Sequence, residues 1–372
     1  MHDSAYPKLT SMKALAILLI MPALALAQTR EPPVGQGVQP YGVIDAGVVL
    51  ERGCKQDCAN SKVSAGISEG SRIGISGREP LGSSGNAAVF TLEGGVENDT
   101  GRSEEGRLLG RQAWVGLDGT WGMLTLGRQY NLQYEALAEV ADPFHGGLAG
   151  TATNLMGFTT RRYDNAIKYR TPSGRQWSAS AIYSFGESEF STSRNRAYGA
   201  TLGFANGMFN VRIAHQRKRN PIEAVGTTQP VDLSARNTLV AANLNFSAAT
   251  VFAAYGINRG LGSSPWDPAN PYGALTLTTP SLYSHDMLAG LSYTSGRFTY
   301  MASFIHKDDR SPPNQDADQA AVGVVYSLSK RTALHASFAH IRNRNGAAYA
   351  AGTATETGKG NRAITFGLRH AF

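Results

Sequence analysis

Apolar and polar residues alternate along most of this chain. Val322, Val324 and Tyr326 share one parity, while Gly323 and Ser327 share the other. A period of two places successive side chains on opposite faces of a β-strand. A helical period of 3.6 does not persist over a useful length of the sequence. The pattern therefore predicts a chain built almost entirely of β-strands.

Sixteen segments of about ten residues carry this alternation. Gly, Pro, Ser and Asn, which favour turns, are frequent between them. The predicted strands are 39–50, 71–79, 86–95, 107–117, 122–130, 164–171, 176–185, 195–205, 208–217, 236–246, 249–258, 284–294, 297–307, 316–328, 331–343 and 362–372.

The connections between these strands are alternately short and long. The short ones include PLGSSG, DGTW, PSGR, ANG and SGR. The long ones lie near 51–70, 96–106, 131–163, 186–194, 218–235, 259–283, 308–315 and 344–361. An even number of strands with all long loops at one end is typical of an outer-membrane barrel. We therefore expect an all-β, antiparallel, 16-stranded transmembrane barrel, wide enough to hold water.

The start of the chain predicts export. Lys13 precedes the apolar run ALAILLIMPALALA, which ends on the small-residue pattern Ala25-Leu26-Ala27. These are the parts of a secretory signal peptide, here beginning naturally at Met12 and cleaved after Ala27. A retained anchor is the alternative. We expect residues 1–27 to be removed and residues 28–372 to form one domain.

Composition narrows the class further. The formal net charge is +7, and charged residues make up 17% of the chain, which does not indicate disorder. No second apolar run reaches the roughly 18 residues of a spanning helix.

Cys54 and Cys58 are the two cysteines. In an exported chain they can form a small disulfide or remain two free thiols, and a metal site would need more ligands nearby.

Several segments together resemble the general trimeric porins of Gram-negative bacteria. They are YGVIDAGV (41–48), SRIGISGREPLG (71–82), GRQAWVGLDGTWGMLTLGRQYN (110–131), NAIKYRTP (165–172), VGVVYSLSKRTALHASFAHI (322–341) and the terminal FGLRHAF. The resemblance implies a homotrimer in the cell outer membrane, with no cofactor. It also implies passive diffusion of small hydrophilic solutes and ions through a water-filled channel.

The same resemblance implies that a long third loop folds into the barrel and narrows the pore. Here the loop follows LGRQYN, and it carries Pro143-Phe144-His145-Gly146-Gly147 where related porins have Pro-Glu-Phe-Gly-Gly. The family's glutamate is absent, so nearby acids are candidates for the acidic side. The candidate constriction residues of the loop are Tyr134, Glu135, Glu139, Asp142, Phe144 and His145.

Arginines form the opposite wall in the family. By motif match the candidates are Arg72, Arg111 and Arg128. Alternation supports only Arg72 as facing the lumen. Arg128 has the parity of the lipid-facing Leu124 and Leu126 unless the strand bends, and Arg111 likewise shares the parity of apolar neighbours. The alternative for these arginines is an interface or loop network.

Alternation places further basic residues in the lumen, namely Arg78, Lys168, Arg170 and Arg212. Together with the missing glutamate they predict a weak preference for anions. The run HQRKRN (215–220) resembles a nucleic-acid patch. At the mouth of an extracellular loop we instead expect a solvated rim contacting lipopolysaccharide, and no nucleic-acid partner.

Two rival classes are a barrel enzyme and an adhesin without channel activity. Gly66-Ile67-Ser68-Glu69-Gly70 matches G-x-S-x-G, but that motif requires a strand before it and a helix after it. Here a polar loop precedes and a predicted strand follows. The histidines are scattered without metal-ligand spacing, so we expect no catalytic residues and no metal.

The segment RAITFGLRHAF (362–372) predicts the sixteenth strand. To remove both sheet edges it must pair with the first strand, around PYGVIDAGVVL. Its ending on Phe372 resembles the C-terminal signal by which the barrel assembly machinery recognises its clients.

Overall fold

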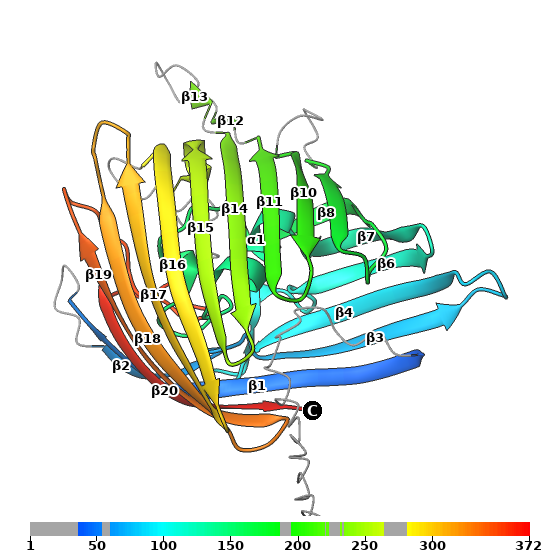
Figure 1. Cartoon of the computed structure of the whole chain (residues 1–372), viewed down its shortest axis with the longest axis horizontal. Helices are drawn as coiled ribbons and strands as arrows, with labels where there is room; N and C mark the ends of the chain where they lie inside the picture. The colour runs from blue at the N-terminus through cyan, green and yellow to red at the C-terminus, as the bar shows by residue number, and fades with distance from the viewer. Residues whose placement is uncertain are drawn as a thin grey trace, which may run out of the picture.

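The computed structural model describes residues 36–53, 60–186, 195–219, 221–222, 231–232, 234–263 and 281–372. The predicted signal peptide and both cysteines lie outside these residues. Figure 1 shows long neighbouring strands that form a curved wall. None of the helices in the described ranges is long and apolar enough to cross a membrane.

Sixteen long strands of the described residues build the wall. They are β1(Gly37–Arg52), β3(Arg72–Pro80), β4(Ala87–Glu97), β6(Gln112–Gly119), β7(Gly122–Tyr130), β8(Arg162–Arg170), β9(Trp177–Ser184), β10(Ala197–Ala205), β11(Phe209–Lys218), β14(Ala235–Phe246), β15(Ala249–Arg259), β16(Tyr283–Ser295), β17(Phe298–Asp309), β18(Ala317–Ser327), β19(Thr332–Asn343) and β20(Arg362–Ala371). Each pairs antiparallel with the next. The predicted fold is confirmed.

The last strand closes the wall on the first, as predicted. β1 pairs with β20 from Val43 opposite Ala371 to Arg52 opposite Arg362. The other edge of β1 pairs with β3 along its first half and with the short β2(Asn60–Ala65) along its second half. All edges of the wall are thereby paired, which a sheet in lipid requires.

One predicted strand differs clearly from the structure. The strand expected at 107–117 begins only at Gln112, and residues 102–106 form β5(Arg102–Ser103) and the turn η1(Glu104–Gly106). The alternating pattern extends into residues 107–111, although these residues form a loop. Arg111 explains the shift, because its guanidinium turns toward Glu93 and Glu104.

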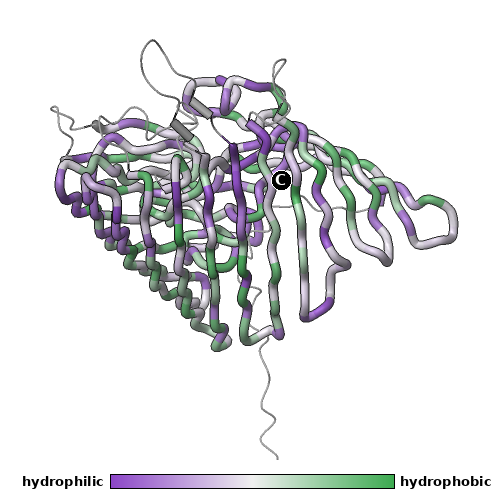
Figure 2. The backbone as a smooth tube through the Cα atoms, turned by 90° about the horizontal axis from the view of Figure 1, so that it is seen from above, coloured by the Kyte–Doolittle hydropathy of each residue, from purple (hydrophilic) through white to green (hydrophobic). Residues whose placement is uncertain are grey.

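The two faces of the wall have opposite character. Phe366 is 55% exposed on the outer face, whereas the neighbouring Thr365 is fully buried. Figure 2 shows hydrophobic and hydrophilic stretches alternating along the strands. Apolar side chains exposed outward suit lipid, and polar side chains inward suit water.

The long connection after β7 lies against the inner face of the wall. It contains α1(Leu132–Ala136), the single turn η2(Leu137–Ala141) and η3(Ala152–Asn154). Asn131 begins α1 by accepting a hydrogen bond from the Tyr134 amide (2.7 Å). Apolar residues of this connection join one buried cluster with inward-facing residues of β11 and β14–β19. Figure 1 shows α1 behind β11 and β14.

Candidate functional site: a basic pocket between the wall and the third loop

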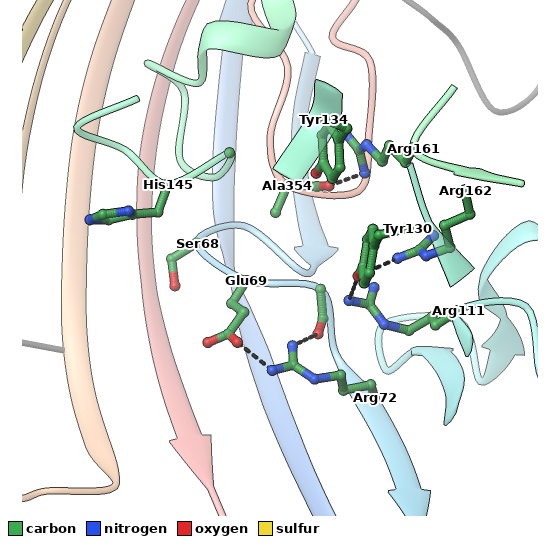
Figure 3. Close-up of a pocket in the computed structure, with 12 residues that line it drawn as sticks. Ser68, Glu69, Arg72, Arg111, Tyr130, Tyr134, His145, Arg161, Arg162 and Ala354 are labelled. Atoms are coloured by element: carbon green, nitrogen blue, oxygen red, sulfur yellow. Dashed lines mark hydrogen bonds and ion pairs between the residues drawn. The ribbon is translucent and has the colours of Figure 1, made fainter. Parts of the chain in front are cut away.

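A pocket lies where the third loop meets the wall of β3, β7 and β8. Figure 3 shows His145 on one side and Arg72, Arg111 and Arg162 across from it. The residues that line the pocket are Ser68, Glu69, Gly70, Arg72, Arg111, Tyr130, Tyr134, His145, Gly146, Arg161, Arg162 and Ala354. Four arginines and one glutamate therefore supply its formal charges.

Arg72 and Arg111 share one acid. Arg72, the first residue of β3, contacts Glu93 through Nε at 3.3 Å and also pairs with Glu69. Arg111 donates from Nε to the other oxygen of Glu93 at 2.9 Å. It also donates to Glu104 at 2.8 Å. Glu93 and Glu104 contact the arginines without lining this pocket, and Glu104 lines a neighbouring cavity instead.

Tyr130 joins Arg111 to a second arginine. Its hydroxyl accepts from Arg111 (2.9 Å) and from Arg162 (2.8 Å). The Arg162 guanidinium lies 4.5 Å from the centre of the Tyr130 ring. Tyr130 also stacks on Tyr134 of the loop, with 5.8 Å between ring centres. The wall and the loop are thus fixed to one another through stacked aromatic rings.

Arg161 differs from the other arginines of the pocket. It donates to the carbonyl of Ala354 and lies 5.7 Å from the centre of the Tyr134 ring. It forms no ion pair with any acid in the described ranges. Sequence analysis placed neither Arg161 nor Arg162 at the constriction. The available signal was the Arg-Arg pair where the long loop enters β8.

Arg128 lies apart from this pocket. A register shift between Gly127 and Gln129 bends β7, and Gly127 has φ 131°. The shift turns both Gln129 and Tyr130 into buried positions but leaves Arg128 on the outward side. There Arg128 pairs with Glu105 and with Asp164 (2.6 Å). The structure therefore brings together Arg72 and Arg111 but not Arg128, which belongs to a loop network.

Two of the loop acids bind basic residues of the wall. Glu135 accepts from Lys168 at 2.6 Å and from Arg170 at 2.8 Å. Glu139 pairs with Arg212 at 2.9 Å. These contacts place Lys168, Arg170 and Arg212 on the inner face, on the parity that alternation gives them. The negative charges of Glu135 and Glu139 are therefore largely compensated by the positive charges of these partners.

Three other candidate residues of the third loop, Asp142, Phe144 and His145, make contacts that hold the conformation of the loop. Asp142 is fully buried and accepts hydrogen bonds from the amides of Phe144, Gly146 and Ala152 at 2.8–2.9 Å. Its carboxylate therefore organises the turn of the loop. Phe144 packs beside Gly150 and Gly323, where no Cβ would fit. His145 has φ 51° and meets the Phe252 ring edge-on at 6.3 Å.

Arg78 lies nearer the short-turn end of the wall. It pairs with Asp118 of β6, and both side chains are about 29% exposed. The run 215–220 is divided by strand alternation. Gln216 is buried inward, where it donates to Gln133 of the loop at 3.0 Å, whereas Arg217 has the parity of outward-facing Ile213. The described residues of this run, 215–219, therefore do not form one continuous basic patch.

An ion pair that sequence analysis missed anchors the end of the third loop. Lys307 of β17 and Asp286 of β16 are both fully buried and 2.9 Å apart. Lys307 also donates to the Leu155 carbonyl (3.1 Å), and the Gly157 amide donates to Asp286 (2.6 Å). Alternation alone could not show that these two residues would meet the loop.

The pocket continues into a second cavity of about 350 Å³. Ser68 and His145 line both spaces. The second cavity is otherwise lined mainly by neutral residues of the loop and inner wall, including Asn210, Asn243 and Thr294. The two spaces therefore lie side by side along the third loop.

Ser68 has the wrong partner for the nucleophile of a hydrolase. Its hydroxyl donates to Asp45 (2.5 Å), which also accepts from the amides of Ile67 and Glu69. His335 contacts the other side of that carboxylate at 3.2 Å. A serine nucleophile needs a base that takes its proton, usually a histidine oriented by an acid. The order here is instead serine, acid, histidine.

Comparison with known proteins gives the family. A model described as Gram-negative porin matches residues 14–346. An outer membrane porin protein of Bordetella pertussis is 28% identical, over 82% of this chain and 88% of its own length. Outer membrane porin protein 32 of Delftia acidovorans is 25% identical, over 97% and 99%.

Solved structures agree on the fold. An anion-selective porin from Comamonas acidovorans superposes with a TM-score of 0.71 at 22% identity, over 90% of this chain and 99% of the other. The trimer form of OmpT, an outer membrane protein of Vibrio cholerae, has a TM-score of 0.64 at 14% identity, over 90% and 99%. With a closed sixteen-stranded wall and a family model covering most of the sequence, the chain belongs to the Gram-negative porin family and is an outer-membrane channel, not an enzyme.

Proposed function

We propose that the pocket between Arg72, Arg111, Arg161 and Arg162 and the third loop is the pore constriction. Small hydrophilic solutes and ions diffuse passively through it, with a weak preference for anions. The observation that carries this proposal is the distribution of charge. Four arginines and one acid, Glu69, line the pocket, whereas the other acid partners, Glu93 and Glu104, do not line it.

The balance of charge favours anions in two ways. Arg161 forms no ion pair with an acid among the described residues, so its positive charge is less compensated than that of the other three arginines. Glu135 and Glu139 of the loop are each paired with a basic group of the wall. A confined aqueous space between low-dielectric walls strengthens the field of the remaining charge. The anion-selective porin among the structural neighbours lends this proposal support.

Reversal potentials test the preference. The purified protein is inserted into planar bilayers, and a tenfold gradient of KCl is applied. We expect stepwise conductance increments and a reversal potential whose sign indicates chloride as the more permeable ion. A reversal potential of the opposite sign contradicts the anion preference, and the absence of increments contradicts the channel.

The assembly is a second part of the proposal. A homotrimer that is exported by its signal peptide, inserted by the barrel assembly machinery and surrounded by lipopolysaccharide fits the family and the outward apolar surface. The OmpT neighbour is described in a trimer form. The mass of the detergent-solubilised complex, measured by light scattering, should correspond to three chains. A mass of one chain contradicts the trimer.

A further inference from the structure

Three arginines lie side by side on the outer face of β11, β14 and β15. Arg217 is the direct partner of Arg236, and Arg236 is the direct partner of Arg259. We call these three residues the arginine row. They share strand parity with Ile213 and Val240, which are 46% and 41% exposed on the lipid-facing side.

The arginine row lies at the end of the barrel that carries the long loops. β11 ends at Lys218 and β14 begins at Ala235, while β15 ends at Arg259 and β16 begins at Tyr283. In outer-membrane barrels the long loops are extracellular. One rung further into the membrane, outward-facing His215 lies opposite Thr238. The row therefore marks the outer edge of the apolar band, at the depth of lipid headgroups.

Like charges directly opposite one another on neighbouring strands are unfavourable. The three arginines form no ion pair with any acid in the described parts of the chain. Two other basic groups at this end have acids beside them. Arg310 pairs with Asp308 at 2.8 Å, and Arg344 pairs with Asp318 at 2.5 Å. Among the described residues, the charge of the row has no acid partner, which leaves it available to an anion from outside the chain.

Aromatic residues flank the arginine row on both sides. Tyr198 of β10 lies opposite Arg217, and Tyr283 of β16 lies opposite Arg259. The Arg259 guanidinium is 4.5 Å from the centre of the Tyr283 ring. The Tyr283 hydroxyl is hydrogen-bonded to Nε2 of His285 at 2.8 Å. Tyrosines occupy the interfacial belt of membrane proteins, so the whole row has the surroundings of a headgroup site.

We propose that the arginine row binds phosphate groups of a glycolipid in the outer leaflet, the lipid A part of lipopolysaccharide. Guanidinium groups bind phosphate through paired hydrogen bonds. The acyl chains then lie on the apolar surface below, over Ile213, Val240 and Met287. This inference gives a site to the lipopolysaccharide contact proposed above, and it is independent of the constriction.

The test compares the wild-type protein with Arg217→Gln/Arg236→Gln/Arg259→Gln in detergent. Native mass spectrometry measures binding of diphosphoryl lipid A, of lipid A without phosphates, and of inorganic phosphate. The control variant is Arg175→Gln/Arg297→Gln/Arg331→Gln. It removes three exposed arginines from the short turns at the other end of the barrel.

We expect the row variant to bind diphosphoryl lipid A at least about tenfold more weakly than wild type, while the control binds normally. Removing the phosphates from the lipid should weaken wild-type binding by a similar factor. Inorganic phosphate at equal concentration should not compete. Equal binding by the row variant and wild type overturns the proposal, as does equal binding of the dephosphorylated lipid. Full competition by free phosphate shows an anion site without a lipid and also overturns it.

Conductance separates this result from the channel proposal. The row lies outside the pore, so the row variant should form channels with wild-type conductance and reversal potential. Resistance of the folded barrel to SDS without heating shows that the variant is folded. A row variant that forms normal channels but still binds lipid A contradicts the lipid proposal alone. A row variant that conducts abnormally contradicts the position of the row outside the pore.

Discussion

Phe372 exchanges two backbone hydrogen bonds with Gly42. The Gly42 amide donates to the Phe372 carbonyl (3.1 Å), and the Phe372 amide donates to the Gly42 carbonyl (3.0 Å). The Phe372 ring lies over Gly42, so that a Cβ at this position would collide with it. The residue after β20 therefore extends the seam that closes the barrel, with a side chain that is 51% exposed toward lipid.

Replacing Phe372 by Ser should impair assembly before it alters conductance. The variant loses the aromatic contact at the seam and the proposed recognition signal, while the pore is unchanged. We expect folded protein in outer-membrane extracts to fall several-fold, measured by SDS mobility without heating. Phe304→Ser, which removes another outward phenylalanine (52% exposed), is the control. A normal yield of the Phe372 variant contradicts the assembly role.

Replacing Lys307 by Met should destabilise the barrel by about 3–5 kcal/mol, because Asp286 would remain charged and buried without its partner. Unfolding in urea measures the loss. The double variant Lys307→Met/Asp286→Asn should recover part of it. Channel recordings of the single variant should also become noisier, because Lys307 holds the Leu155 carbonyl of the third loop. Unchanged stability would show that the pair does not anchor the loop.

Replacing Arg161 by Gln should reduce the anion preference. Arg161 forms no ion pair with an acid in the described part of the chain, so its removal leaves no buried carboxylate there without its ion-pair partner. Removal of Arg111 would leave Glu93 and Glu104 without that partner. We expect the reversal potential in a KCl gradient to move toward zero, with little change in stability. Arg175→Gln on an exposed short turn removes the same charge away from the pocket and should leave selectivity unchanged. If both variants have the same selectivity as wild type, this pocket is not the pore constriction.

The stability of the protein should depend on Glu69 in acid. Burial on its own would raise the pKa of Glu69, but Arg72 and Arg369 lower it from 4.5 to about 2. The carboxylate therefore stabilises the folded protein above pH 4.5, by about 3 kcal/mol at most. This contribution is lost as the pH falls from 4.5 to 2. The stability difference between wild type and Glu69→Gln, measured by urea unfolding, should shrink across that interval and stay constant above it.

Replacing Ser68 by Ala should leave conductance and selectivity intact. Asp45 keeps three backbone donors, from Ile67, Ser68 and Glu69, after the hydroxyl is lost. The expected loss of stability is about 1 kcal/mol. A large change in single-channel conductance would instead give the hydroxyl a role at the junction of the two cavities.

Alternation allowed the wall to be predicted almost completely. A strand in a membrane barrel faces lipid on one side and water on the other. The alternation of apolar and polar residues within each strand therefore identifies it as part of the barrel. The seam between β1 and β20 followed from the requirement that no sheet edge remain open. The expected strand at 107–117 was wrong at its start, because alternation does not register where a side chain such as Arg111 turns into a charge cluster.

The site could be predicted only in part. Arg72, Lys168 and Arg212 carry the correct parity for the inner face, and the length of the third loop indicated its importance. Arg128 could not be placed, because the register shift after Gly127 depends on the pairing of β7 with β8. Arg161 and Arg162 gave only the faint signal of a basic pair at a strand entry.

The sequence by itself determined the strand count, the faces, the closure and the membrane, because each depends on local period and on backbone hydrogen bonding. Only the tertiary structure decided which acid meets which base. Glu93 between Arg72 and Arg111, Lys307 against Asp286, and Arg217 beside Arg236 each join residues of different strands. Such pairings follow from register and loop packing, and electrostatic interactions depend on distance in space, not on separation along the chain.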